Sequence, residues 1–335
     1  MKKLNSVIIA ILFIAIFSAG CKKTTPTPPT PLEPPVLTIL SQSNLTTSSA
    51  TIKFNIVTNS NKLTEVGICY STTKSPTTSS AKTASTVKEG TATVSLSNLT
   101  PNTKYYYRVY AVDNKGTTYY SDSTKRVWPY DFKDIDGNGY HAVTIGTQTY
   151  TLENLRVTHY RDGSPIPNIT DDMAWHNDKK GAYCYYDNNK AKYDSLYGAL
   201  YNFYAVESPH VLAPKGWHIP SFDEWGVLYQ YVTFHGGGKL KEAGTKHWKA
   251  PNLDATNSTG FTALPGGDRG DADNGSLGTF GDDLGTDAAF WSTTLFSDGR
   301  SALIMHLFYN YNFIAVGGAY LYDSGFSVRL IKNKR

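Results

Sequence analysis

Residues 214–238, PKGWHIPSFDEWGVLYQYVTFHGGG, are the stretch of the 335-residue chain that says most about its fold. Ser221 and Glu224 have the spacing of a capping box, in which each side chain accepts a hydrogen bond from a backbone amide at the start of a helix. The apolar side chains that follow recur at i, i+3, i+4 and i+7, namely Trp225, Leu228, Tyr229 and Val232. This spacing predicts an amphipathic helix that starts after Ser221 and ends before Gly236-Gly237-Gly238.

A second helix is predicted upstream, with Asp194 or Ser195 as its N-cap. Its apolar face would consist of Leu196, Leu200, Phe203 and Tyr204. In the remaining sequence, apolar and polar residues alternate or turn residues occur, and a long loop rich in Gly and Asp lies between Gly260 and Ala289. Residues 130–335 are therefore expected to form an α+β domain of two helices packed on antiparallel strands.

Residues 134–140 superficially match the first half of a calcium loop. The twelfth position of that loop would be Ile145, where a bidentate glutamate is required. The Asp-Gly and Asn-Gly pairs of this segment instead predict a hairpin turn. A strand is expected to follow, running from Val143 through Ile145 to Tyr150.

Several short motifs across the last two hundred residues occur in the order found in one bacterial family. They are Val143–Gly146, Leu152–Leu155, Tyr197-Gly198, Pro214–Ser221 with Glu224-Trp225, Gly260–Gly267, Trp291-Ser292 and Gly325–Arg329. On these motifs the segment resembles the Fibrobacter succinogenes major paralogous domain, which is similar in turn to the sulfatase-modifying-factor group with its C-type-lectin-like core. The resemblance implies a C-type-lectin-like fold and an extracytoplasmic location, without an established molecular activity.

The preceding segment, residues 36–129, shows no helical periodicity and reads as a β-sandwich. Ile52, Phe54 and Ile56 alternate along one predicted strand, as half-buried strands do. Leu99, Pro101 and Tyr105 resemble the corner of fibronectin type III domains, where a tyrosine hydroxyl bonds back to the chain. The fold class expected for the whole chain is thus multidomain: an all-β fibronectin III-like sandwich followed by an α+β C-type-lectin-like domain.

The N-terminal segment has the features of a targeting signal. Lys2 and Lys3 precede an apolar run too short to span a bilayer, which predicts a signal peptide over residues 1–20. The tetrad Ser18-Ala19-Gly20-Cys21 resembles a bacterial lipobox, which implies lipidation of Cys21; the alternative is an ordinary signal peptide with an incidental cysteine. Residues 21–35 hold six prolines and predict an extended linker. We expect a cell-envelope protein, lipid-anchored to the outer membrane, with its surface or periplasmic orientation open.

Composition and motif searches exclude several function classes. The formal net charge of +4 falls to +2 without Lys2 and Lys3, so nucleic acid is not an expected partner. Three cysteines cannot form a disulfide scaffold or a cysteine-based zinc module. The sequence contains no nucleophile elbow, metalloprotease helix or nucleotide-binding fingerprint. His218 is expected to be structural and Cys184 to be buried, so no catalytic residue is assigned and no enzyme is expected.

The best candidate site lies in the long loop after Pro265. Six aspartates stand there against one arginine, among seven glycines between Leu264 and Asp287. Carboxylates of such a loop can supply oxygen ligands, so one hypothesis is that Asp268, Asp271 and Asp273 bind Ca²⁺. The alternative is that Asp and Gly only form turns and keep a long surface loop solvated.

Four further residues are candidate ligand contacts: Trp248, Arg269, Tyr309 and Tyr311. Trp248 would stack on a sugar, whereas Tyr309 and Tyr311 alternate along a strand and could equally form its core face. The function expected from these features is binding of carbohydrate or glycoconjugate by a monomeric lipoprotein. The alternative is an adhesive or structural surface protein that binds a protein partner or joins a fimbria-like assembly.

Overall fold

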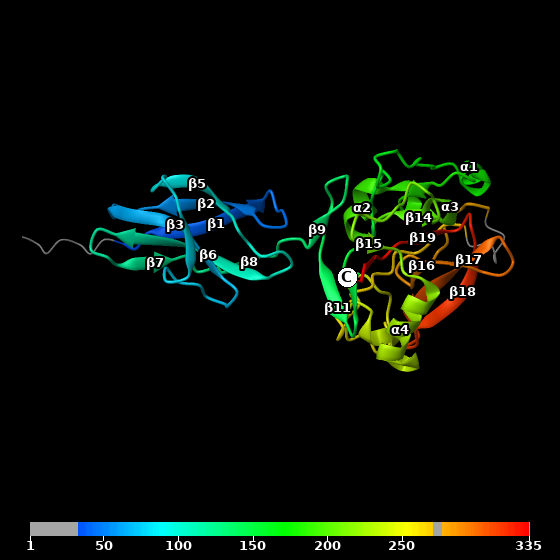
Figure 1. The fold of residues 1–335 in the computed structure, drawn as a ribbon. Helices are drawn as coiled ribbons and strands as arrows, with labels where there is room; N and C mark the ends of the chain where they lie inside the picture. Colours follow the sequence, from blue (N-terminus) through cyan, green and yellow to red (C-terminus); the bar gives the residue numbers. More distant parts are fainter. Residues whose placement is uncertain (1–32, 271–276, 335) are drawn as a thin grey trace, which may run out of the picture.

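The computed structural model describes residues 33–270 and 277–334. The predicted signal peptide and Cys21 lie outside these residues, as do Asp271 and Asp273. Figure 1 shows two lobes, one formed by β1 to β8 and the other by everything from β9 onward. Strands make up most of the regular structure in both lobes, and the helices of the second lobe are few and short. No helix in the described part of the chain is long and apolar enough to cross a bilayer.

The first lobe is a sandwich of two antiparallel sheets. One sheet has the strand order β1-β2-β5, and the other has the order β4-β3-β6-β7 with β8 also paired to β6. The strands are β1 (Val36–Ser43), β2 (Ala50–Val57), β3 (Leu63–Ser71), β4 (Ala81–Ala84), β5 (Gly90–Leu96), β6 (Tyr105–Asp113), β7 (Thr118–Tyr120) and β8 (Lys125–Val127).

The sequence pattern predicted this sandwich well. Ile52, Phe54 and Ile56 are all buried on β2, because successive side chains of a strand point to opposite faces. The expected tyrosine corner is also present: the backbone amide of Thr100 donates to the Tyr105 hydroxyl at 3.1 Å. A fibronectin type III-like sandwich is therefore confirmed for the N-terminal domain.

The second lobe contains two sheets with the orders β11-β12-β20-β15 and β13-β14-β19-β16-β17-β18, plus the short pair β9 and β10. Its strands are β9 (Phe132–Lys133), β10 (Gly139–Tyr140), β11 (Ala142–Ile145), β12 (Gln148–Thr151), β13 (Tyr183–Cys184), β14 (Leu200–Asn202), β15 (Trp217–His218), β16 (Asp287–Leu295), β17 (Ser301–Phe308), β18 (Ala315–Leu321), β19 (Gly325–Ser327) and β20 (Ile331–Lys332). Its helices are α1 (Asp172–Asn177), α2 (Lys190–Tyr197), α3 (Phe203–Val206) and α4 (Phe222–Val232), with the 3-10 turns η1 (Tyr186–Asn188) and η2 (Phe234–Lys239). The last strand, β20, pairs with β12, so the two ends of this domain lie together (Figure 1).

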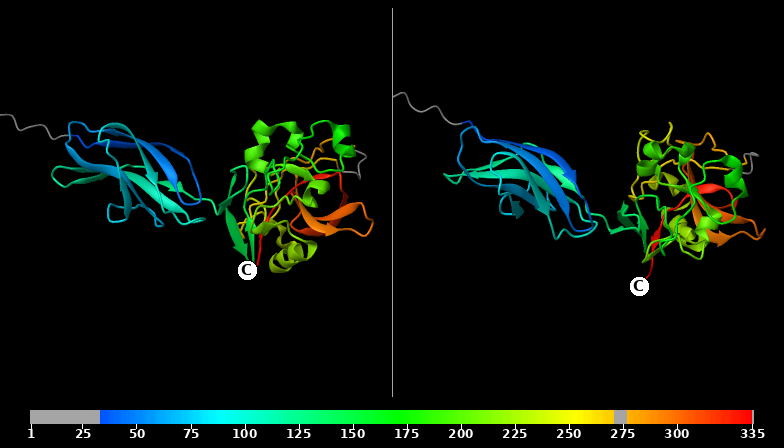
Figure 2. Two further views of the ribbon diagram at one scale, coloured as in Figure 1. Left: turned by 45° about the horizontal axis from the view of Figure 1, so that its top comes forward. Right: turned by 90° about the horizontal axis from the view of Figure 1, so that it is seen from above.

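The two lobes meet through specific contacts rather than through a bare linker. The rings of Trp128 and His141 stack with centroids 3.9 Å apart, and Asn102 Nδ2 donates to the carbonyl oxygen of Ala142 at 2.8 Å. The Tyr130 ring lies directly on Gly139, where an added Cβ would come within 2.2 Å of it. The views in Figure 2 show that the contact is confined to one end of each lobe.

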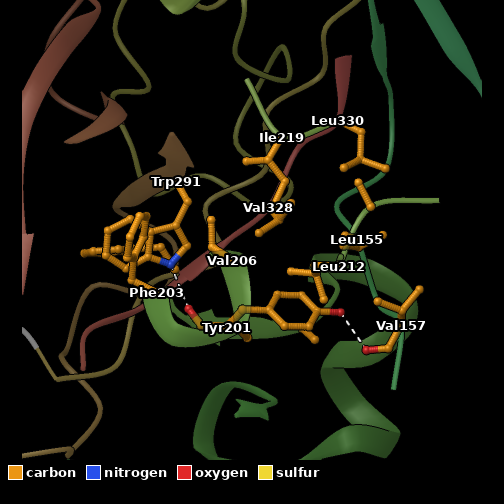
Figure 3. Packing of buried hydrophobic residues seen from close by; sticks show 14 of the residues in the cluster. Leu155, Val157, Tyr201, Phe203, Val206, Leu212, Ile219, Trp291, Val328 and Leu330 are labelled. Atoms are coloured by element: carbon orange, nitrogen blue, oxygen red, sulfur yellow. Dashed lines mark hydrogen bonds between the residues drawn. The ribbon is translucent and has the colours of Figure 1, made fainter. Parts of the chain in front are cut away.

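The main core of the second lobe lies between its sheets and the short helices. Figure 3 shows Trp291 and Tyr201 in this core, where the Trp291 indole N–H donates to the Tyr201 carbonyl oxygen at 2.7 Å. The Tyr201 hydroxyl donates in turn to the carbonyl oxygen of Val157 at 2.8 Å. Buried aromatic residues in this core thus carry polar atoms that are satisfied by the backbone.

The predicted helix after Ser221 is confirmed as α4, and its capping box is formed. The Ser221 amide donates to Glu224 Oε2 at 2.9 Å, and the Glu224 amide donates to Ser221 Oγ at 3.2 Å. The hairpin turn predicted over residues 134–140 is also confirmed, because β9 and β10 pair across it.

Two predicted elements are wrong. Residues 194–204 do not form one helix: α2 ends at Tyr197, and Leu200–Asn202 forms β14, which pairs with β19. Gly198 ends α2 with a φ of 77°, and a Cβ there would lie 2.8 Å from the carbonyl oxygen of Leu155. The expected single strand over residues 143–150 is a hairpin of β11 and β12, which turns at Gly146.

The capping box generates a pH-dependent prediction. Burial opposes ionisation of Glu224, but the Ser221 amide and the His218 imidazole hold its pKa below the ordinary 4.5. A lowered folded-state pKa adds stability above the unfolded-state pKa, and this stability is lost as the pH falls through the folded-state value. Glu224→Gln should therefore cost about 1 kcal/mol at neutral pH and progressively less below about pH 4.

Denaturant unfolding at a series of pH values measures this difference. Asp223→Asn is the matched control, because Asp223 lies in the same first turn without the capping contacts and should change stability by less than about 0.5 kcal/mol. An equal effect of both variants at all pH values would contradict the assigned role of Glu224.

Candidate functional site

The site is built on one face of the hairpin formed by β16 and β17. Asp287 pairs with Phe308, and Ala289 pairs with His306. Because side chains alternate along a strand, these four residues share a face with Trp291 of the main core. The same face therefore carries apolar core residues in its middle and polar and aromatic residues at its end.

At that end lies a pocket of about 520 Å³, here called the acidic pocket. It is lined by Asp268, Phe280, Gly281, Asp282, Asp283, Thr286, Asp287, His306, Phe308 and Tyr320. The lining residues come from the loop segments on either side of residues 271–276 and from three neighbouring strands. A volume of this size is in the range of small-molecule sites.

Two of the carboxylates converge over Gly281. A Cβ added to this glycine would lie 3.0 Å from Asp283 Oδ1 and 3.6 Å from Asp268 Oδ1. Asp268 is 6% exposed, and burial raises the pKa of Asp283, to which the charge of Asp287 also contributes. The absence of a side chain at Gly281 thus leaves room for both carboxylates to lie close to each other.

His306 closes the strand side of the pocket. It is 8% exposed, and its ring lies 4.0 Å from the Phe308 ring, centroid to centroid. Its Nε2 atom makes no hydrogen bond within the described part of the chain and lies 3.6 Å from Asp287 Oδ2. The pocket therefore contains a buried imidazole nitrogen with unused hydrogen-bonding capacity.

Arg269 positions the loop that carries Asp268. Its buried guanidinium lies between the rings of Trp175 and Phe280, 4.7 Å from each centroid. It donates to Gly278 O at 2.6 Å and to three oxygens of residues 169–172 at 2.6 to 3.0 Å. These bonds tie both sides of the acidic pocket's loop to the region around α1.

Lys241 positions the end of β17. Its buried ammonium donates to the carbonyl oxygens of Leu253, Phe308 and Tyr311 at 2.9 to 3.0 Å. The backbone of Phe308, and hence its ring at the pocket wall, is fixed by this contact. An ammonium has three donors, and all three are used here.

The structure corrects two of the predicted ligand contacts. Trp248 is 1% exposed and donates its indole N–H to the Ala263 carbonyl oxygen at 2.9 Å, so it is a core residue and the prediction that it stacks on a ligand is wrong. Arg269 is fully buried and its donors are taken up by the chain, so the prediction of a ligand contact is wrong for it as well. Large or charged side chains near a loop are typical of binding sites, but these two are held in the interior.

The other predicted residues fall into three groups. Asp268 lines the acidic pocket, whereas Asp271 and Asp273 lie outside the described residues. Tyr309 is partly buried against a core cluster that includes Trp225 and Trp248. Tyr311 is 48% exposed beside Phe308, with ring centroids 5.9 Å apart. Within the described residues, no group of three or more His, Cys, Asp or Glu is placed to hold a metal ion.

Sequence reasoning missed His306, Phe308, Phe280 and Tyr320 as pocket residues. The alternation of the residues from 302 to 308 places His306 and Phe308 on one strand face. That pattern could have paired them, but their proximity to Asp287 depends on strand register, which the sequence does not display. Phe280 and Tyr320 carry no local signal that distinguishes them from core aromatics.

The residues expected to have no catalytic role have structural contacts. His218 Nδ1 lies 2.7 Å from Asn333 Oδ1, and its Nε2 lies 2.9 Å from Glu224 Oε1, so the imidazole supports the capping box. Cys69 and Cys184 are buried and not disulfide-bonded, and burial raises the pKa of the Cys184 thiol to about 12. A thiol of this pKa is protonated at neutral pH and is a poor nucleophile.

Comparison with known proteins identifies both domains. Residues 143–332 match the Fibrobacter succinogenes major domain, and residues 34–127 match the fibronectin type III domain. No curated protein matches the chain.

The chain is also similar to solved structures that each cover less than a third of it. A structure described as a myokine is 14% identical, covers 29% of this chain and 98% of its own, and has a TM-score of 0.23. The sensor domain of the anti-sigma factor RsgI4 from Pseudobacteroides cellulosolvens is 14% identical over 29% of this chain and 98% of its own, with a TM-score of 0.22. A fibronectin type III domain of the human KIAA0970 protein is 14% identical over 28% of this chain and 72% of its own, with a TM-score of 0.21.

The buried guanidinium of Arg269 leads to a stability prediction. Arg269→Met removes a buried cation and leaves Asp172 and several carbonyl oxygens without their donor, so we expect a loss of about 3–5 kcal/mol of unfolding free energy. Arg300→Met is the control, because the Arg300 side chain is 78% exposed and its removal should cost less than about 0.5 kcal/mol. Denaturant unfolding of the full chain measures both; similar stabilities would contradict the positioning role of Arg269.

Proposed function

Because the chain belongs to the Fibrobacter succinogenes major domain family, which matches residues 143–332, we propose that it is a cell-envelope protein that binds carbohydrate or glycoconjugate at the acidic pocket. The pairing of this domain with a fibronectin type III domain indicates a surface or adhesion-type protein. The proposed role is binding without catalysis, and the protonated state of the buried Cys184 thiol supports it.

One observation carries the proposal: carboxylates and aromatic rings line the same hollow. Carboxylate oxygens accept hydrogen bonds from hydroxyl groups, and Asp282 and Asp287 offer such acceptors at the pocket surface. Aromatic rings such as those of Phe280 and Phe308 offer apolar faces against which the C–H face of a sugar ring can pack. The exposed Tyr311 extends this aromatic surface beyond Phe308.

We further propose that the second domain is C-type-lectin-like. The pairing of its last strand β20 with β12 supports this, because it brings both ends of the domain together. The acidic pocket is formed in part by loop segments, and binding residues are commonly carried by loops on a rigid scaffold.

A second candidate function, adhesion through a protein partner, is favoured by an apolar hollow on another face. This hollow of about 360 Å³ is lined by Phe222, Gly226, Tyr229, Phe234, Phe313, Ile314, Ala315 and Val316. Phe234 is 50% exposed and stacks on Phe313, with centroids 5.6 Å apart. The neighbouring β18 stands at the end of its sheet, and an edge strand can pair with another chain.

The glycan proposal is tested on an array probed with the full chain in neutral detergent. We expect binding to a restricted set of glycans, and Phe308→Ala should weaken it by about threefold to tenfold because one stacking face is lost. Phe296→Ala is the matched control, since Phe296 is 45% exposed and lies outside the pocket. A blank array would favour the adhesive function.

The proposed anchor is tested separately. Ser18-Ala19-Gly20-Cys21 resembles a lipobox, and acyl chains on Cys21 would make membrane attachment effectively permanent. Cys21→Ala should move the protein from the membrane fraction to the soluble fraction, measured by fractionation and immunoblotting. Cys69→Ala, which changes a buried cysteine, should leave the distribution unchanged; retention of the Cys21 variant in the membrane would rule out the lipid anchor.

A further inference from the structure

The residues that line the acidic pocket carry an excess of negative charge. Four of its lining residues are aspartates, and none is Lys or Arg. The one basic side chain that lines it is His306, whose Nε2 makes no hydrogen bond within the described residues. The pocket thus presents acceptors and negative charge, and no cation of its own lining offsets them.

Two buried cations that contact residues of the pocket lining, Arg269 and Lys241, are bound to groups outside the pocket. The guanidinium of Arg269 faces Gly278, residues 169–172 and the ring faces of Trp175 and Phe280. The ammonium of Lys241 is held by three carbonyl oxygens. The described lining therefore offers no Lys or Arg to its aspartates, and a ligand could supply the missing cation.

The geometry points to a primary ammonium group as the part of the ligand that the acidic pocket recognises: we propose that the pocket binds an amine-bearing sugar, with the ammonium among the carboxylates of Asp268, Asp283 and Asp287. This inference rests on the proposed glycan function and specifies its ligand class.

Three observations favour an ammonium over other ligands. An ammonium donates three hydrogen bonds, which suits carboxylates that approach from different loop segments and from β16. Phe280 and Phe308 line the same space, and aromatic faces attract cations. An anionic sugar would meet like charge among these carboxylates.

His306 has a defined place in this arrangement. It is 92% buried, as its exposed fraction is 8%, and it lies between Asp287 and Phe308. A neutral imidazole has one acceptor nitrogen and one donor nitrogen. As an acceptor, Nε2 would receive a hydrogen bond from the ligand's ammonium or from an adjacent hydroxyl, which would satisfy the nitrogen that the chain itself leaves without one.

The test compares two tetrasaccharides that differ only at the amine: the fully deacetylated glucosamine tetramer and its N-acetylated counterpart. Isothermal titration calorimetry is done with the full chain in neutral detergent and EDTA at about pH 5, because sugar amines are less basic than a lysine side chain and must be protonated in this test. We expect at least about tenfold tighter binding of the deacetylated tetramer, with the preference reduced by added salt because part of the attraction is Coulombic.

Variants locate the effect. Asp287→Asn removes one of the three carboxylates that hold the ammonium and should weaken binding of the deacetylated tetramer by about tenfold. Asp282→Asn removes a neighbouring charge of the same lining and should weaken it by about threefold. Asp122→Asn is the matched control, because Asp122 is an exposed carboxylate on the first domain and should leave binding unchanged. Thermal unfolding of each variant establishes that it is folded; Asp282 is exposed, so its substitution tests the pocket even where the Asp287 variant is unstable.

The outcomes separate the two proposals. Equal affinity for both tetramers would overturn the ammonium inference and leave glycan binding standing. Binding of spermidine with the same variant pattern, without binding of either tetramer, would support the ammonium site and overturn the glycan function. Binding of neither the sugars nor spermidine, or a preference that Asp122→Asn alone removes, would overturn the ammonium inference.

Discussion

The second domain depends on buried cations that bind backbone carbonyl oxygens. Much of its chain between α4 and β16 is irregular, so many carbonyl oxygens there have no partner in a helix or sheet. Arg269, Lys241 and Arg329 each donate to one such oxygen, those of Gly278, Leu253 and Phe261, and also to carbonyl oxygens outside this segment. Arg329 Nη1 donates to the carbonyl oxygens of Thr151 and Phe261, 3.0 and 2.8 Å away. Since a buried carbonyl without a hydrogen bond is costly, these three side chains allow loops to pack where regular structure would otherwise be needed.

This constraint explains why the acidic pocket lies where it does. Arg269 fixes the loop next to Asp268, and Lys241 fixes the end of β17 next to Phe308. The two held segments meet beside Asp287, at the end of the hairpin whose middle is filled by Trp291 and the main core. The carboxylates are thus carried by segments whose backbones are held on both sides, which favours a pre-formed binding site over one that orders on binding.

The parts of the fold and of the site that could be predicted from the sequence are those whose sequence pattern is local. The capping box of Ser221 and Glu224 and the alternation of β2 are local patterns, and both were read correctly from the sequence. The segment around Leu200 has helical periodicity, but pairing with β19 decided its structure, and that partner lies more than a hundred residues away. Trp248 and Arg269 were placed at the site because of their residue types, and only the packing shows that both are interior. The acidic character of the loop was visible in the sequence, while His306 and Phe308 became part of the site only through strand register.

The acidic pocket also bears on the stability of the domain. Burial raises the pKa of Asp283, so its ionised form is less favourable in the folded chain than in the unfolded chain. Burial of carboxylates close to one another therefore opposes folding, and the hydrogen bond between Asp268 and Asp283 offsets part of this cost. A positively charged ligand would offset the unfavourable contribution of these carboxylates to folding. Because such a ligand would bind only the folded state, it would raise the free energy of unfolding. The arrangement is the one expected where charges are kept for recognition at some cost in stability, because aspartates used only for turns and solvation would face solvent and not one another.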